Sequence, residues 1–238
     1  KLNILNWEEV QNELCKQIED FLNGGGMVNK IIIKKKSVTT VYAESTPNPN
    51  VMKFVLNKKM FDDVFEFKEV EETENAPLAK SLYTFPFVKE VFFDFNFISV
   101  TQHNGLNWDE NVMDVREFIR SYINDGNILI NEELIQNKLN KATPNYENVD
   151  DTSKQIISII EQHVKPAVAS DGGNIVFESY DKETKNVNVI LQGACSGCPS
   201  STVTLKNGIE NMLKQMLPGL ISDAVSYTHL RAHETVAN

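Results

Sequence analysis

Two cysteines at C-x-x-C spacing, Cys195 and Cys198, are the residues of this sequence best suited to chemistry. They lie in the segment 193–200, GACSGCPS, and only small residues separate them. Thiols three positions apart can point the same way where the backbone is free to curl. Both sulfurs could therefore bind one metal ion or cluster, or each other.

The pair is half of a metal site. Soft metals and iron-sulfur clusters need about four thiolate or imidazole ligands, and no histidine lies beside the two cysteines. The third cysteine, Cys15, belongs to a different predicted domain, where we interpret it as a bystander on a helix flank. The missing ligands come most simply from a second copy of the chain, which predicts a homodimer whose formation is part of the chemistry.

The pattern around the pair predicts a strand over residues 187–192 and a helix over residues 202–216. Ser200 and Ser201 are predicted N-cap residues of that helix. A helix N-terminus carries partial positive charge, so we expect the pKa of the Cys198 thiol to fall below the free value of about 8.5.

Composition excludes several function classes. The chain has 238 residues and a formal net charge of -10, which argues against nucleic acid or an anionic membrane as partner. It has no apolar run of about 18 residues, the length of a membrane span. Three cysteines do not make a disulfide scaffold, so we expect a reducing compartment, the bacterial cytoplasm. The chain starts at Lys1 rather than Met, which leaves room for a mitochondrial targeting segment ahead of it.

A repeat with an offset of 101 positions connects the start of the chain to its middle. LNWEE at 5–9 aligns without a gap to LNWDE at 106–110, and the apolar period and a following glycine also match. The pattern predicts that residues 1–33 are the C-terminal part of a truncated copy of the domain that follows. One amphipathic helix is expected over residues 6–23.

The complete copy is predicted over residues 38–135 as a small α+β domain. Strands are expected at 38–43 and 51–56, separated by the turn TPNPN at 46–50, and a hairpin at 88–93 and 97–101. Helices are expected at 76–83 and 109–124. The phenylalanines between 85 and 97 are interpreted as core. We find no catalytic constellation here, so the chain is not expected to be an enzyme.

A polar, aperiodic linker is predicted over 136–150, and a second domain over 151–224. That domain should hold a helix over 154–168, capped by Ser153 and bent near Pro166, followed by strands at 174–180 and 187–192. The predicted fold class is α+β: two small α+β domains joined by a polar linker and preceded by a partial copy of the first.

The residues just described resemble one known family. The stretch 164–219, with KP at 165–166, DGG at 171–173, LQGAC at 191–195 and GCP at 197–199, is similar to the C-terminal domain of NifU-type (Nfu) iron-sulfur cluster scaffolds and carriers. Residues 41–130, with TPNPN followed by MKF at 52–54, resemble the N-terminal domain of that family. The resemblance implies that Cys195 and Cys198 ligate a [4Fe-4S] cluster shared between two chains. It also implies that an upstream cluster assembly scaffold supplies this cluster and that apo iron-sulfur acceptor proteins receive it.

Residues 225–238 look like the translation of a sequencing adapter read in frame, and we expect them not to belong to the fold. This hypothesis removes His229 and His233 as metal ligands, although their i, i+4 spacing suits a metal. It also implies that the strand which relatives carry after the last helix is cut short at 220–224.

Three alternatives stay open. A zinc-binding structural module uses the same thiolates. A thioredoxin-like dithiol oxidoreductase also places C-x-x-C before a helix, but it requires a βαβ context, which the sequence pattern does not indicate. A pure interaction module would leave two exposed thiols idle and open to oxidation.

Overall fold

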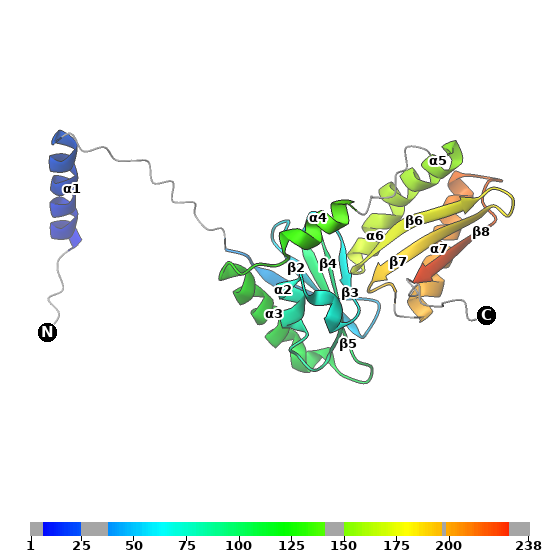
Figure 1. The fold of residues 1–238 in the computed structure, drawn as a ribbon, viewed down its shortest axis with the longest axis horizontal. Helices are drawn as coiled ribbons and strands as arrows, with labels where there is room; N and C mark the ends of the chain where they lie inside the picture. Colours follow the sequence, from blue (N-terminus) through cyan, green and yellow to red (C-terminus); the bar gives the residue numbers. More distant parts are fainter. Residues whose placement is uncertain (1–6, 25–37, 141–149, 197–198, 229–238) are drawn as a thin grey trace. The chain divides into compact units, whose positions relative to one another are not determined.

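The computed structural model describes residues 7–24, 38–140, 150–196 and 199–228 (Figure 1). The chain divides into two compact units, residues 1–37 and 38–238, and each is described by itself. The first contains helix α1 (Trp7–Asn23), as the apolar period predicts, with Cys15 exposed on it. Its counterpart in the repeat, α3 (Trp108–Asn124), has the same 17 residues in length and starts at the matching tryptophan. The truncated-copy hypothesis for residues 1–33 stays a prediction, and residues 1–6 and 25–33 lie outside the described residues.

The N-terminal domain of the second unit is built on a five-stranded antiparallel sheet in the order β1-β2-β5-β4-β3. The strands are β1 (Val41–Ser45), β2 (Val51–Leu56), β3 (Phe65–Phe67), β4 (Val88–Asp94) and β5 (Phe97–Gln102). The predicted β4–β5 hairpin and the turn before β2 are confirmed. Strand β3 was missed because three residues are too short to show an alternating period.

The helical elements of this domain are η1 (Val70–Thr73), α2 (Pro77–Leu82), α3 and α4 (Glu132–Asn140). The side chain of Asn107 caps α3 by accepting from the Asp109 N–H at 3.1 Å. Residues 136–140 belong to α4, so the linker prediction was wrong for them, and 141–149 lie outside the described residues.

The two faces of this sheet are used differently, as expected from the alternation of side chains along a strand. One face packs with residues of α2 and α3 in the main core, which includes Phe54, Phe93 and Ile119. The opposite face buries a second small cluster around Val55, Phe92 and Phe97. The prediction that the phenylalanines are core therefore holds on both faces, but Phe95, at the β4–β5 turn, is exposed.

The C-terminal domain begins with a helix that changes its winding. Segment α5 (Asp151–Ile159) leads into a π-helical turn, η3 (Ile160–Val164), and then α6 (Lys165–Ser170). The irregularity falls just before Pro166, where the missing N–H and the ring clash disfavour a regular α-helix. The predicted Ser153 cap is wrong: the Asp150 carboxylate accepts the Thr152 and Ser153 N–H groups at 3.1 and 3.3 Å.

The rest of the domain is β6 (Gly173–Asp181), β7 (Asn186–Gly193), α7 (Pro199–Met216) and β8 (Asp223–Thr228). Strands β6 and β7 form where they were predicted and pair antiparallel, and β8 pairs parallel with β7. Strand β7, helix α7 and strand β8 therefore form the βαβ unit that the sequence pattern did not indicate. Strand β8 includes residues 225–228, whose backbone pairs with β7 through Thr228. The expectations that the chain after 224 does not belong to the fold, and that the last strand is cut short at 220–224, are therefore wrong for residues 225–228. The adapter origin of 225–238 stays a prediction, because backbone pairing does not depend on side-chain identity.

The core of this domain lies between the sheet and its helices. It contains Ile156, Ile160, Val168, Ile175, Leu191, Cys195 and Leu213 among others. Within the described residues, no helix combines the length and the apolar character that a membrane span requires.

Candidate functional site

Cys195 lies in a tight turn directly after β7. The Ser196 N–H and the Ser196 hydroxyl both donate to the Gly193 carbonyl, at 3.0 and 2.9 Å, and the Ala194 N–H donates to the Gly172 carbonyl at 3.2 Å. Helix α7 begins at Pro199, a residue favoured in the first turn of a helix, so the predicted caps Ser200 and Ser201 lie inside the helix. Cys198 lies outside the described residues, and its predicted lowered pKa remains a prediction.

The Cys195 side chain is packed inward. It is 5% exposed and belongs to the hydrophobic core of the C-terminal domain. A Cβ placed on Gly173 would lie 2.9 Å from the Cys195 Sγ, so the sulfur sits directly over this glycine. Only a residue without a side chain leaves room for the thiol, which gives the DGG motif a physical role that the sequence pattern did not reveal.

Burial, and secondly the nearby Asp171 carboxylate, raise the pKa of the Cys195 thiol to about 12. Both act in the same direction because each disfavours a thiolate. In this conformation the Cys195 thiol is therefore neutral at physiological pH. A metal would have to displace its proton, as thiolate ligation generally requires.

The prediction that one chain supplies two ligands, Cys195 and Cys198, stays a prediction, because Cys198 lies outside the described residues. Among the residues that the structure describes, no three His, Cys, Asp or Glu side chains are grouped so that they could hold a metal ion. Cys15 lies exposed in the other unit of the chain. His103 is exposed.

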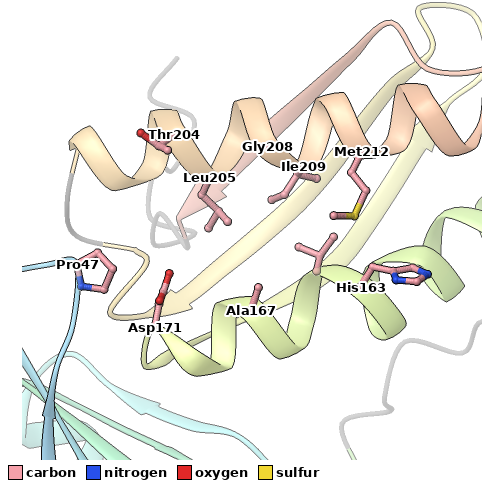
Figure 2. Close-up of a pocket in the computed structure, with 10 residues that line it drawn as sticks. Pro47, His163, Ala167, Asp171, Thr204, Leu205, Gly208, Ile209 and Met212 are labelled. Carbon is pink, nitrogen blue, oxygen red and sulfur yellow. The ribbon is translucent and has the colours of Figure 1, made fainter.

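An apolar groove, which no sequence motif indicated, opens beside the cysteine turn (Figure 2). It has a volume of about 500 Å³. It lies between the η3–α6 segment and α7, with residues of both helical segments facing each other across it. Asp171 and Leu205 line both this groove and a small cavity of about 30 Å³ at Cys195. The groove is lined by Pro47, His163, Val164, Ala167, Asp171, Thr204, Leu205, Gly208, Ile209 and Met212.

The βαβ unit bears on the oxidoreductase alternative. Its presence removes the objection raised from the sequence, since C-x-x-C at the junction of β7 and α7 is the expected position for such a motif. The Cys195 thiol, however, is poorly suited to disulfide exchange. That reaction depends on a thiolate, and burial raises the pKa of this thiol.

Comparison with known proteins matches both domains. The family model described as "Scaffold protein Nfu/NifU N terminal" matches residues 41–126, and the one described as "NifU-like domain" matches residues 156–222. These ranges contain the five-stranded sheet and the cysteine turn respectively. The chain belongs to the NifU-like (Nfu) family of scaffold proteins.

Individual relatives agree. NifU-like protein 4, mitochondrial, of Arabidopsis thaliana is 36% identical over 73% of this chain and 61% of its own length. A NifU-like protein of Schizosaccharomyces pombe is 33% identical over 75% of this chain and 69% of its own length. The human protein named NFU1 iron-sulfur cluster scaffold homolog, mitochondrial, is 33% identical over 75% and 68%. The chain thus spans less than two thirds of the Arabidopsis relative.

Among solved structures, a NifU-like protein from Saccharomyces cerevisiae matches 44% of this chain and 93% of its own. The TM-score is 0.36 and the sequence identity is 14%.

Proposed function

We propose that this chain binds a [4Fe-4S] cluster through Cys195 and Cys198, that two chains share one cluster, and that they pass it to apo iron-sulfur proteins. The observation that carries the proposal is the family's NifU-like domain with two cysteines at the β7–α7 junction. A [4Fe-4S] cluster is held by about four cysteine thiolates, twice the number that the Cys195 and Cys198 of one chain provide. Two chains together supply all the thiolates, and the pair from either chain can be replaced by thiolates of an acceptor protein.

The cluster is cargo in this proposal rather than a resident cofactor. It arrives from an upstream assembly scaffold and leaves when the thiolates of an acceptor replace those of this chain, so the protein is a carrier and not an enzyme. The relatives from Arabidopsis and human are named mitochondrial. Their names support a mitochondrial location over the bacterial cytoplasm expected from composition.

Anaerobic reconstitution with iron and sulfide tests this function. We expect a brown dimer with about four irons per two chains, as the four-cysteine rule requires. Cys195→Ser or Cys198→Ser should each abolish the chromophore and the dimer. Cys15→Ser is the matched control and should change neither, because Cys15 is exposed in the other unit. Iron and sulfide quantitation with size-exclusion chromatography and light scattering provides the readout.

Two results would contradict the proposal. Colourless protein that binds one zinc ion per monomer would favour the structural zinc module. Reduction of insulin by the reduced chain, lost in Cys195→Ser, would favour the dithiol oxidoreductase.

A further inference from the structure

The second face of the N-terminal sheet buries polar side chains as well as apolar ones. Lys53 and Ser99 point from neighbouring strands β2 and β5 toward this face and are 8% and 1% exposed, and Asn48 of the preceding turn is 4% exposed. Buried lysine is costly unless its charge is paired and its hydrogen bonds are made. The outer face of an antiparallel sheet is ordinarily solvated, so these residues need partners.

Lys53 pairs with the Glu44 carboxylate of its own domain at 3.4 Å and lies over the Phe97 ring. The other partners of Lys53 and Ser99 are main-chain atoms of the C-terminal domain, in the segment 170–172 beside the cysteine turn. The Lys53 Nζ donates to the Ser170 carbonyl at 3.1 Å. The Ser99 hydroxyl donates to the Gly172 carbonyl at 2.7 Å.

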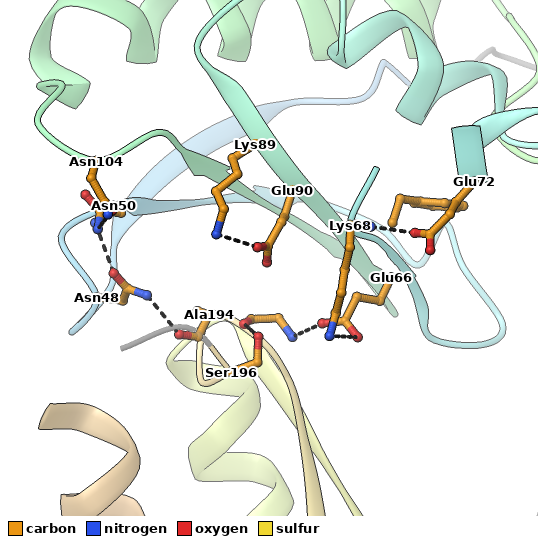
Figure 3. A network of polar contacts seen from close by, with 12 residues as sticks. Asn48, Asn50, Glu66, Lys68, Glu72, Lys89, Glu90, Asn104, Ala194 and Ser196 are labelled. Carbon is orange, nitrogen blue, oxygen red and sulfur yellow. Dashed lines mark hydrogen bonds and ion pairs between the residues drawn. The ribbon is translucent and has the colours of Figure 1, made fainter. Parts of the chain in front are cut away.

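Two more bonds hold the turn itself (Figure 3). The Asn48 Nδ2 donates to the Ala194 carbonyl at 3.2 Å, next to Cys195. The Gly193 N–H donates to the Glu66 Oε1 at 2.9 Å. Residues of the turn 46–50, β2, β3 and β5 thus all bond to the segments 170–172 and 193–194, which both precede Cys195 in the sequence.

The two glycines at this contact fit the face closely. Gly172 and Gly193 have φ of +83° and +64°, values that few other residues adopt. A Cβ on Gly172 would lie 2.8 Å from the Ser99 Oγ, and one on Gly193 would lie 2.9 Å from the Phe92 ring. At Gly172 and Gly193 the backbone therefore lies too close to the sheet to leave room for a Cβ.

This contact leaves little space at Cys195. The cavity beside it holds about 30 Å³ and is lined by Pro47 and Asn48 of the N-terminal domain together with Asp171, Ala194, Cys195 and Leu205. Such a volume takes about one or two water molecules. A cluster with about four thiolate ligands, two of them from another chain, needs far more room.

We propose that the N-terminal sheet is an intramolecular latch: its second face holds the cysteine turn closed in the cluster-free chain and releases it before two turns share a cluster. The latch consists of Asn48, Lys53, Glu66 and Ser99 with the apolar surface of Phe92. The proposal rests on the proposed function in taking the cysteines as the site that the latch controls.

The test measures how fast N-ethylmaleimide modifies each cysteine of the full apo-chain, with peptide mass spectrometry to separate them. Exposed Cys15 serves as internal reference. We expect Cys195 to react far more slowly than Cys15 in the unaltered chain. Lys53→Met combined with Ser99→Ala should raise the Cys195 rate about tenfold, because the reactive population grows when hydrogen bonds across the contact are lost.

Lys59→Met is the matched control. Lys59 also pairs with a carboxylate, Asp62 at 2.8 Å, and lies over an aromatic ring, Phe95, but all of these belong to the N-terminal domain. Its removal should leave the Cys195 rate unchanged. Should the double variant lose its cooperative melting transition, Glu66→Gln decides the question with an expected rise of several-fold in the Cys195 rate. This change weakens the charge-assisted bond to the Gly193 N–H and removes the ion pair with Lys68 at 4.0 Å.

Two results would overturn the latch: Cys195 reacting as fast as Cys15 in the unaltered chain, or a slow Cys195 rate that the folded variants do not change. Neither result depends on iron. If labelling supports the latch but reconstitution yields no cluster, the proposed function fails and the latch stands as a gate on the thiols. If both hold, the latch variants should also take up the cluster faster than the Lys59→Met control.

Discussion

The Cys195 side chain occupies the space that a side chain at position 173 would need, and Gly173 leaves that space free. The Cys195 sulfur lies over Gly173, and a Cβ there would also come within 2.5 Å of the Gln192 carbonyl. This neighbour is backbone and cannot turn away. The site therefore depends on a residue 22 positions before the cysteine, at the start of the paired strand β6.

Gly173→Ala is expected to lower the free energy of unfolding by about 1 to 3 kcal/mol, the usual cost of overpacking. Gly208→Ala is the matched control, because it lies in α7 with nothing within 4 Å of the added Cβ. That change should raise stability by up to about 1 kcal/mol through helix propensity. Urea unfolding of both variants checks the difference, and equal effects would contradict the packing described for Gly173.

Tyr83 gives the N-terminal domain a dependence on alkaline pH. Its hydroxyl donates to the Phe67 carbonyl at 2.8 Å and contacts the Lys89 carbonyl at 3.2 Å. Burial, followed by the negative charges of Glu90 and the η1 region, raises the pKa of Tyr83 well above its ordinary value. The folded state favours the protonated phenol, so its stabilisation is complete below the unfolded pKa of about 10 and is lost as pH rises beyond it.

Tyr83→Phe should therefore flatten the fall in unfolding free energy above pH 10, at a cost of about 1 kcal/mol at pH 7 for the lost hydrogen bond. Tyr122→Phe also removes a hydroxyl hydrogen bond, to the Ile128 carbonyl at 3.0 Å, and serves as the control that keeps the alkaline fall. Urea unfolding of both variants, measured from pH 8 to pH 11, would show whether the fall in unfolding free energy differs between them. An unchanged slope in Tyr83→Phe would assign the alkaline sensitivity to another group.

At the scale of elements, strand β8 contains residues from both sides of the predicted adapter boundary. Its backbone pairs with β7 from Asp223 to Thr228, across the predicted adapter boundary at 224. Main-chain pairing alone explains how a foreign sequence can complete a strand, provided that it contains no proline.

A chain that ends at Ala224 should keep full metal binding after reconstitution and lose a little stability with the outer part of β8. Iron content and thermal melting of the shortened chain measure the two effects. The histidines are tested separately: a loss of metal in His229→Ala or His233→Ala, absent in a matched Ser226→Ala variant, would show that this segment supplies ligands.

At the same scale, the sequence predicted the elements with clear periods and missed those without. The hairpin β4–β5, strands β6 and β7, and helices α1, α3 and α7 follow from alternation or helical spacing. Strand β3 and the π-helical turn are too short or irregular for either signal. Helix caps were predicted less well, since Asp150 and not Ser153 caps α5, and a cap depends on local geometry as much as on residue type.

At the scale of the whole molecule, the family and the two-domain α+β fold were predictable from motifs. The groove between α6 and α7 and the contact between the cysteine turn and the N-terminal sheet were not. Residues that meet there are far apart in the sequence, as with Asn48 and Ala194, and they bond to main-chain atoms. Because every residue has the same main chain, such a contact leaves no motif.

That reliance on main-chain atoms has an evolutionary consequence. The exposed side chain of Ser170 can be exchanged for others without loss of the hydrogen bond that the Ser170 carbonyl accepts from Lys53. The sequence at this position can thus change while the contact with the N-terminal sheet is kept. Gly172, Gly193 and the buried Ala194 do not have this freedom, because their surroundings leave no room for a larger side chain.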